Sequence, residues 1–155
     1  MEKLIKRISQ IGMVVDDIDA YIKRYTEEYG IGPWEIVRFG KEIFPELLID
    51  GKPGELEMKC AFCKVKGFEI ELIEPISESI FSKFLRENGP GFHHVAIESD
   101  RSFQEMIVMV RNKGEKPLMH VQTPDGKDFL AYLDLKKEIG FCVEIFGEAG
   151  KRESK

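Results

Sequence analysis

The pattern of apolar and polar positions predicts five elements in the first half of the chain. Alternation over residues 7–17 indicates a strand, which ends on an aspartate at the position of a helix N-cap. A 3.6-residue period over 17–30 indicates an amphipathic helix closed by a glycine. Three further strands are expected at 34–40, 55–65 and 68–75. The predicted order is β-α-β-β-β.

The second half repeats this order. A linking helix is expected over 77–91, where Asn-Gly-Pro-Gly ends it, and a strand follows at 93–100. Ser102 and Glu105 have the spacing of a capping box and open a helix over 102–114. The remaining strands are expected at 116–124, 128–135 and 140–147. Strands and helices in this order predict an α+β fold.

Matching residues support an internal repeat. Gln10 and His94 open equivalent strands, and each is followed by an aspartate six positions later. The last strands of the two halves contain matching motifs: Phe-Glu-Ile-Glu, which ends at Glu71, and Phe-Cys-Val-Glu, which ends at Glu144. We therefore predict one domain, 1–155, built from two tandem βαβββ modules, 5–76 and 92–147, that are joined by the linking helix.

Strand alternation places the candidate functional side chains on one face of each strand. Ile11, Met13 and Val15 share an apolar face, which leaves Gln10 and Gly12 on the other. Four matched strands each turn one polar group away from the apolar face in this way: Gln10, Glu71, His94 and Glu144. A half-open mixed β-barrel, with helices outside and a cavity inside, would gather these groups.

Two of the three histidines are adjacent, and alternation assigns them to opposite faces. His94 is the candidate for chemistry, whereas His93 is expected to lie against the core or the linking helix. The two are therefore not expected to serve one site together. His120, on a later strand, is expected to be a plain strand histidine.

Composition narrows the function classes. With 43% hydrophobic and 33% charged residues the chain is expected to be soluble, and a net charge of −5 disfavours nucleic acid or an anionic membrane as a partner. No signal peptide or membrane span is expected, so the cytoplasm is the predicted location. Three cysteines make no disulfide framework, and Cys60 and Cys63 are expected to be reduced thiols in a strand.

The four polar groups would supply one nitrogen and three oxygen ligands. Imidazole with carboxylates suits a borderline divalent ion, and an octahedral site would keep positions open for water or substrate. Two glutamates would offset the 2+ charge. The sequence therefore predicts a divalent metal site.

Three segments, QIGMVVDDIDA, FEIELIEP and NGPGFHHVAIES, together with the repeated module resemble the vicinal oxygen chelate superfamily. That superfamily includes glyoxalase I, methylmalonyl-CoA epimerases, extradiol dioxygenases and bleomycin-resistance proteins. The resemblance covers about 5–146 and is nearest to the epimerases. It implies a metal such as Co, Ni, Mn or Zn, held by one residue from each of four strands, which fall on Gln10, Glu71, His94 and Glu144.

This sequence departs from the epimerase pattern in its ligands and in one acid/base residue. Epimerases usually carry His at Gln10 and often Gln at Glu71, so the present set is more similar to that of eukaryotic-type glyoxalase I. A glutamate proposed as an acid/base in some epimerases aligns with Lys59. Because Lys59 shares a face with Glu57 and Ala61, it is expected to face the cavity.

The resemblance implies a metal-dependent isomerase or lyase that abstracts a proton next to a metal-bound carbonyl. Glu144 is the expected base, Glu71 lies opposite it, and Lys59 is a candidate donor. The substrate would be an acyl-CoA thioester for an epimerase or a 2-oxoaldehyde–thiol adduct for a lactoylglutathione lyase of the glyoxalase I type. A metal-free ligand-binding protein of the bleomycin-resistance kind is the alternative from another class.

Two further residues are candidates for the substrate pocket. Tyr132 aligns with a position that lines the cavity in relatives. Trp34 either borders an acyl pocket or has a structural role. Two modules can complete a cavity within one chain, whereas relatives commonly form homodimers, and both arrangements stay open.

Overall fold

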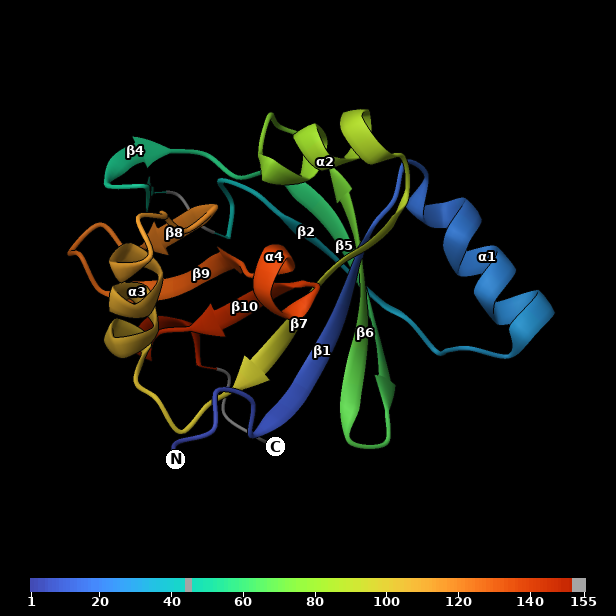
Figure 1. Ribbon diagram of the computed structural model, residues 1–155. Helices are drawn as coiled ribbons and strands as arrows, with labels where there is room; N and C mark the ends of the chain where they lie inside the picture. The colour runs from blue at the N-terminus through green and yellow to red at the C-terminus, as the bar shows by residue number, and fades with distance from the viewer. Residues whose placement is uncertain (44–45, 152–155) are drawn as a thin grey trace. The chain divides into compact units, whose positions relative to one another are not determined.

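The computed structural model describes residues 1–43 and 46–151, which form two compact units (Figure 1). We name them after the predicted ligands that they contain. The Gln10 unit comprises Ser9–Pro45 and Glu55–His94. The Glu144 unit comprises Met1–Ile8, Glu46–Gly54 and Val95–Lys155.

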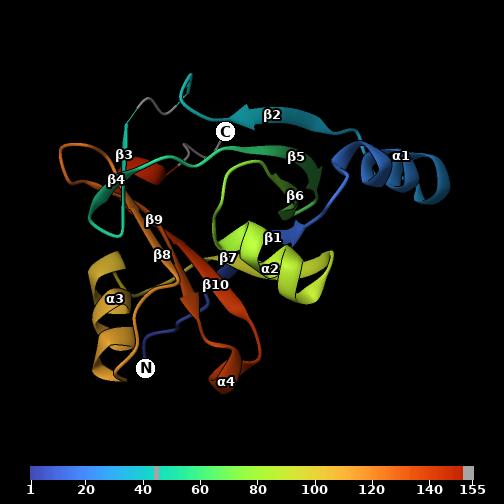
Figure 2. The ribbon, with the colours of Figure 1, turned by 90° about the horizontal axis from the view of Figure 1, so that it is seen from above.

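Strands of the Gln10 unit lie in the order β2-β5-β6-β1. Only β1 and β6 run parallel, and the other neighbours are antiparallel. Figure 2 shows β2 and β5 side by side. β7 begins in this unit and continues into the other. The strands are β1 (Arg7–Val14), β2 (Glu35–Phe39), β5 (Met58–Val65), β6 (Phe68–Pro75) and β7 (Gly91–Glu98).

Helix α1 (Ile18–Tyr29) covers one face of these strands. Asp17 caps its N-terminus by accepting the backbone N–H of Ala20, and Gly30 ends it with a φ of 65°, as the sequence predicted. Ile18 lies in an apolar cluster with Val15, Ala61 and Leu72, onto which Met13 also packs. The apolar face predicted for β1 is therefore the face that packs under the helix.

The strand register places the polar groups on the opposite face. Gln10 lies opposite Glu69, and Gly12 lies opposite Glu71. Since Met13 lies opposite Leu72 in the α1 cluster, alternation directs Gln10, Gly12, Glu69 and Glu71 away from α1.

The linking helix α2 (Ile80–Asn88) starts at a capping box. The side chain of Ser79 accepts backbone N–H groups of the first turn, and Ser82 Oγ accepts the backbone N–H of Ser79. Phe81 is fully buried. This helix brings aromatic side chains to the start of β7.

Strands of the Glu144 unit lie in the order β10-β9-β8-β3-β4 and are antiparallel throughout. α3 (Phe103–Asn112) carries the predicted capping box of Ser102 and Glu105. It buries an apolar stripe of Met106, Ile107 and Val110. The other elements are β3 (Leu47–Ile49), β4 (Lys52–Gly54), β8 (Met119–Gln122), β9 (Asp128–Asp134), α4 (Lys136–Ile139), β10 (Cys142–Phe146) and a 3₁₀ turn, Glu148–Gly150.

The element order is β-α-β-β-β twice, as predicted, with two additions. α4 is a single turn after β9, and the hairpin β3-β4 interrupts the first half. The turn of this hairpin has Asp50 and Gly51 at positive φ, 52° and 80°. The Asp-Gly pair directly after the apolar run Leu47–Ile49 was the available signal in the sequence. The polar end of the chain after 147 begins with the 3₁₀ turn, and residues 152–155 lie outside the described residues.

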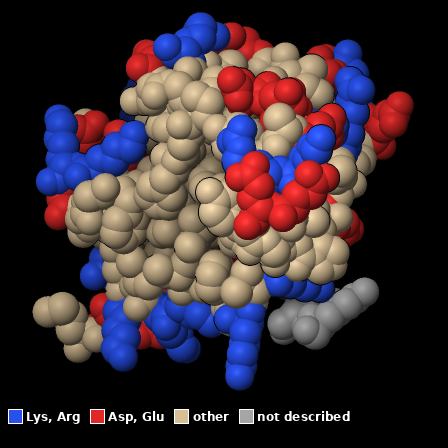
Figure 3. Space-filling model, turned by 90° about the vertical axis from the view of Figure 1, so that its right-hand side faces the viewer, with Lys and Arg blue, Asp and Glu red and all other residues tan. Residues whose placement is uncertain are grey.

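The buried cysteines agree with the expectation of reduced thiols. Cys60, Cys63 and Cys142 are buried, and among the described residues none of them is in a disulfide. Within the described part of the chain, no helix is long and apolar enough to cross a membrane. Figure 3 shows acidic and basic side chains interspersed on one face of the molecule, without a broad field of one sign there.

Candidate functional site

Glu69 fixes the orientation of Gln10. Gln10 is buried on β1, and its Nε2 donates to Glu69 Oε1 at 3.0 Å. A carboxylate can only accept, so the amide must turn its nitrogen toward Glu69. The amide oxygen, which is the atom that a metal would bind, therefore occupies the other branch of the side chain. Glu69 was missed at the sequence level, although alternation puts it on the same face as Glu71.

Gly12 makes room for His94. A Cβ added at Gly12 would overlap the imidazole of His94, whose Nδ1 would lie 2.6 Å away. The ring thus packs on the backbone of β1, at the residue that lies opposite Glu71. His94 is fully buried and Glu71 is 7% exposed, and His94 Nε2 lies 3.7 Å from Glu71 Oε1.

The chemistry of these groups is compatible with a divalent ion. The 3.7 Å between Nε2 and Oε1 exceeds a hydrogen bond. It is within the span of two ligands that each lie about 2.1 Å from a shared ion. Imidazole, carboxylate and the amide oxygen of Gln10 suit a borderline metal. Among the described residues no three His, Cys, Asp or Glu side chains form a metal-binding group, so a centre here needs Gln10 or a further ligand.

His93 lies against the linking helix, as predicted, but it also contacts His94. Its ring packs edge-on against Phe81 and Phe84, with centroid distances of 5.2 and 4.9 Å. Its Nδ1 lies 3.0 Å from the Nδ1 of His94. The two rings are therefore in contact, although alternation assigns their Cβ atoms to opposite faces of the strand. Alternation fixes the directions of the Cβ atoms, whereas the ring nitrogens lie further out and can meet.

Glu144 belongs to the other unit, where a tyrosine accompanies it. It is 3% exposed, lies on β10 and pairs with Tyr132 of β9. Tyr132 is also buried and pairs with Met119 of β8. Directly opposed residues share a face, so Tyr132 and Glu144 lie side by side on one face of this sheet.

Lys59 does not lie on the Glu71 face, which corrects the prediction made for it. It shares a face with Ala61, as expected, but Ala61 lies opposite Leu72 in the cluster under α1. The residue opposite Glu71 is Phe62. The Lys59 ammonium pairs with Asp19 of α1 at 2.9 Å.

Trp34 is partly buried and packs against the apolar cluster under α1. Its ring stacks on Tyr25 at a centroid distance of 5.7 Å, and its Nε1 donates to the carbonyl oxygen of Ile31 at 2.8 Å. It is one of the partly buried residues packed against the cluster of Ile18 and Leu72. These contacts favour a structural role for Trp34 over an acyl pocket.

Cys142 does not supply a thiolate at neutral pH. Burial, as the largest cause, raises the pKa of Cys142 to about 12. The pKa of Cys63 is likewise raised, first by burial and then by Glu69. The raised pKa values keep both side chains as neutral thiols at neutral pH, so neither is a ready nucleophile.

His120 has a structural environment. Its Nε2 lies 2.7 Å from Asp128 Oδ1, and its backbone N–H donates to Asp50 Oδ1 at 2.9 Å. Phe103 of α3 lies against the ring, at a centroid distance of 5.5 Å. These contacts tie β8, β9 and the β3-β4 hairpin together, in agreement with a plain strand histidine.

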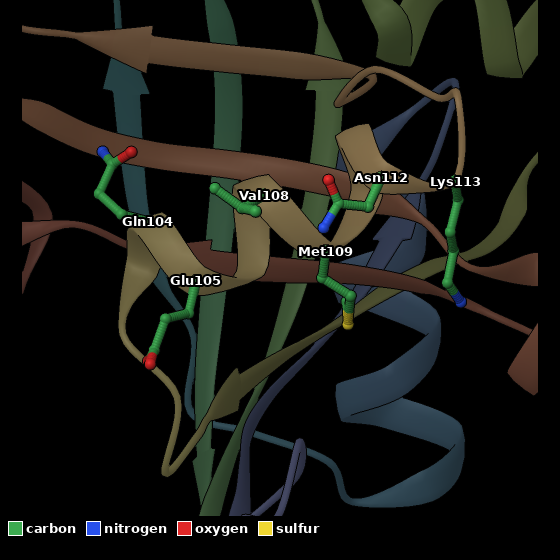
Figure 4. Close-up of a pocket in the computed structure, with 6 residues that line it drawn as sticks. All are labelled: Gln104, Glu105, Val108, Met109, Asn112 and Lys113. Carbon is green, nitrogen blue, oxygen red and sulfur yellow. The ribbon is translucent and has the colours of Figure 1, made fainter.

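A shallow pocket of about 550 Å³ lies on the outer side of α3. Figure 4 shows lining side chains that project from successive turns of α3, with Lys113 on the segment that follows the helix. None is a predicted site residue. The lining residues are Gln104, Glu105, Val108, Met109, Asn112 and Lys113.

Solved structures share the fold of this chain. A hypothetical protein from Bacillus halodurans C-125 is 24% identical, with a TM-score of 0.62, and the match covers 96% of this chain and 97% of that one. Methylmalonyl-CoA epimerase from Mycobacterium tuberculosis is 20% identical, with a TM-score of 0.57, and the match covers 93% and 89%. A substituted Streptomyces coelicolor methylmalonyl-CoA epimerase in complex with 2-nitronate-propionyl-CoA is 23% identical, with a TM-score of 0.61 and coverage of 91% and 96%.

Family membership follows from the sequence match. No curated protein matches the chain. Residues 9–132 match the Glyoxalase/Bleomycin resistance protein/Dioxygenase superfamily, and this segment contains Gln10, Glu71 and His94. The match and the shared fold confirm the predicted glyoxalase-like α+β class. The chain belongs to the glyoxalase/bleomycin resistance/dioxygenase superfamily, also called the vicinal oxygen chelate superfamily.

Proposed function

We propose that this protein is a metal-dependent isomerase or lyase that removes a proton from a carbon next to a substrate carbonyl. One observation carries the proposal: a buried imidazole nitrogen and a buried carboxylate oxygen lie 3.7 Å apart beside Gly12. A divalent ion bound there would act as a Lewis acid and stabilise negative charge that develops on the carbonyl oxygen.

Three residues of the Gln10 unit would hold the ion. His94 would bind through Nε2, Glu71 through a carboxylate oxygen, and Gln10 through the amide oxygen that its bond to Glu69 orients. For Glu144 the support is the sequence repeat, in which it matches Glu71. We include it as the fourth ligand on that ground.

The proposed proton transfers depend on carboxylates. A carboxylate close to the reacting carbon is a competent general base, and Glu144 is the proposed base. Returning the proton requires an acid, and the position of Lys59 beside Asp19 on the α1 face argues against that residue. Glu71 is therefore the proposed second acid/base group.

An acyl-CoA thioester is the proposed substrate class. The likeness to the Mycobacterium tuberculosis and Streptomyces coelicolor epimerases supports it, and the compound in complex with the second enzyme, 2-nitronate-propionyl-CoA, is itself an acyl-CoA derivative. With identities of 20–23%, these relatives suggest the class and leave the acyl group to experiment.

A second candidate is a lactoylglutathione lyase of the glyoxalase I type. The donor set favours it, because Gln10 and Glu71 replace the His and Gln expected of an epimerase. In that reaction the abstracted proton moves to the neighbouring carbon, which two glutamates can accomplish without a lysine donor.

Metal content and isotope exchange test the proposal. Wild type, Glu144→Ala and His94→Ala are stripped, reloaded separately with Co, Ni, Mn and Zn, and assayed by plasma mass spectrometry. His120→Asn is the matched control, because His120 is a half-buried histidine paired with Asp128 outside the candidate centre. Near-stoichiometric metal in wild type and the control, but not in the other two variants, is expected.

Loaded wild type is then given methylmalonyl-CoA in D₂O, or the methylglyoxal–glutathione adduct. Deuterium at the α-carbon of the thioester supports the epimerase, and isomerisation of the adduct supports the lyase. Wild type that takes up none of the four metals would overturn the proposal. A metal-free ligand-binding function would then lead.

A further inference from the structure

Glu69 and Glu71 lie on the same face of β6 and have different neighbours on β1. Glu69 lies opposite Gln10. Glu71 lies opposite Gly12, and the His94 imidazole packs on that glycine. Residues two apart along a strand share a face and lie about 6–7 Å from each other. The pair of Gln10 and Glu69 is therefore the row of side chains next to the imidazole and the carboxylate of the candidate centre.

The two ends of the Gln10 amide differ in what they can bind. The oxygen has lone pairs for a metal ion, whereas the NH₂ group only donates hydrogen bonds. The two ends are nearly equal in size, so packing alone does not choose between them. A carboxylate does choose, because it accepts a hydrogen bond from the nitrogen and repels the oxygen. The Nε2 of Gln10 donates to Glu69 Oε1 at 3.0 Å.

We propose that Glu69 is a positioning residue, whose carboxylate holds the amide nitrogen of Gln10 and so reserves the amide oxygen for the ion. This inference rests on the proposed metal centre. Acceptors that orient a metal ligand from behind contribute to metal affinity, and their substitution typically costs 10- to 100-fold. Gln10 needs such a partner more than a carboxylate ligand does, since only one end of its side chain can bind a metal.

Two observations place Glu69 behind the ligands and not among them. Within the described residues no three His, Cys, Asp or Glu side chains could hold a metal together, so Glu69 does not complete a site with Glu71 and His94. Lys64 of β5 lies opposite Glu69, on the side away from Gln10. Directly opposed residues share a face, so this lysine brings a positive charge to the side of Glu69 that is remote from the centre.

A double-mutant cycle separates positioning from a direct effect of the charge on the ion. Glu69→Gln keeps the size of the side chain, but the new amide can donate as well as accept and no longer selects one end of Gln10. Co²⁺ affinity, measured by competition with a chromophoric chelator, should fall about tenfold. In a Gln10→Ala background the same substitution should have no further effect, because Glu69 acts through Gln10. No loss in wild type, or an equal loss in both backgrounds, would overturn the inference.

Glu74→Gln is the matched control. Glu74 is another half-buried glutamate of β6, but it lies opposite Lys59 on the α1 face. The substitution removes the same charge from the same strand and leaves Gln10 with its partner. Its Co²⁺ affinity should equal that of wild type. A loss as large as that in Glu69→Gln would show that net charge, and not the orientation of Gln10, determines the affinity.

A second readout needs no metal. The side-chain amide protons of Gln10 are followed by ¹H–¹⁵N NMR in the metal-free full chain. The inference expects one Nε2 proton to resonate downfield of the range of solvent-exposed primary amides in wild type, and to return toward that range in Glu69→Ala. Both protons within that range in wild type would overturn it, whatever the metal result. Wild type that takes up no metal but shows the shifted proton would overturn the proposed function alone.

Discussion

Gly12 is the residue on which the packing of His94 depends. The imidazole occupies the space that any larger side chain would fill, and Gly12 has no need of positive φ. Gly12→Ala is therefore expected to displace the ring and lower metal affinity at least tenfold, as misplacing a ligand should. The measurement is the same chelator competition with Co²⁺.

Gly91→Ala is the matched control for this substitution. Gly91 also lies on a strand of the Gln10 unit, but a Cβ there has nothing within 4 Å. Its metal affinity should equal that of wild type. Wild-type affinity in Gly12→Ala as well would mean that His94 is not a ligand in the position that it occupies beside β1.

Substitution of Lys59 tests whether this side chain lies on the α1 face, away from Glu71. Its ammonium pairs with Asp19, an exposed residue of α1. Lys59→Ala should leave turnover by the metal-loaded protein near wild type and cost no more than about 1 kcal/mol in the free energy of unfolding, as for other surface ion pairs. Turnover reduced more than about tenfold, or 1.4 kcal/mol in the barrier, with metal still bound, would restore Lys59 as a proton donor.

At the scale of elements, the N-terminal cap of α3 makes a pH-dependent contribution to the free energy of unfolding. The pKa of the Glu105 carboxyl is lowered, first by the backbone N–H of Ser102 that it accepts and then by the Ser102 side chain. A lowered pKa in the folded state stabilises the fold above the ordinary pKa of 4.5. That stabilisation is lost as the pH falls through the folded-state value.

Glu105→Gln removes this charge and keeps the capping geometry available. Wild type should exceed the variant in the free energy of unfolding at pH 7, and the difference should vanish in acid, well below pH 4.5. Urea unfolding at a series of pH values measures it. A difference that is the same at pH 7 and pH 3 would show that the charge of Glu105 does not contribute.

Elements were predictable where the pattern was local. The sequence predicted that α1 begins after Asp17 and ends at Gly30, and that α3 begins after Ser102. These ends were predictable because a helix cap depends on residues within a few positions of it. Lys59 was misplaced because alternation relates residues only within a strand. Glu71 of β6 can lie on the same side of the sheet as either Ala61 or Phe62 of β5. Cross-strand register decides between them, and the sequence does not specify that register. The His93–His94 contact depends on ring orientation and was equally hidden.

At the scale of the whole molecule, the repeat in the sequence is the main support for a single metal centre. Gln10 and His94 stand at equivalent positions of the two halves, and so do Glu71 and Glu144. The structure places the first three in one unit on the face away from α1, and it buries Glu144 on β10 of the other. What the repeat adds is the expectation that all four residues depend on the same ion.

Thermal unfolding of the full chain tests that expectation. A ligand at 100 times its Kd stabilises the native state by about 2.7 kcal/mol. For a chain of this size such a gain should raise the Tm by roughly 5–10 °C. We expect that shift in wild type with excess Co²⁺ and its loss in both His94→Ala and Glu144→Ala. A full shift in Glu144→Ala together with none in His94→Ala would confine the ion to the Gln10 unit. The proton-abstracting base would then have to be sought among the residues of that unit, with Glu71 first.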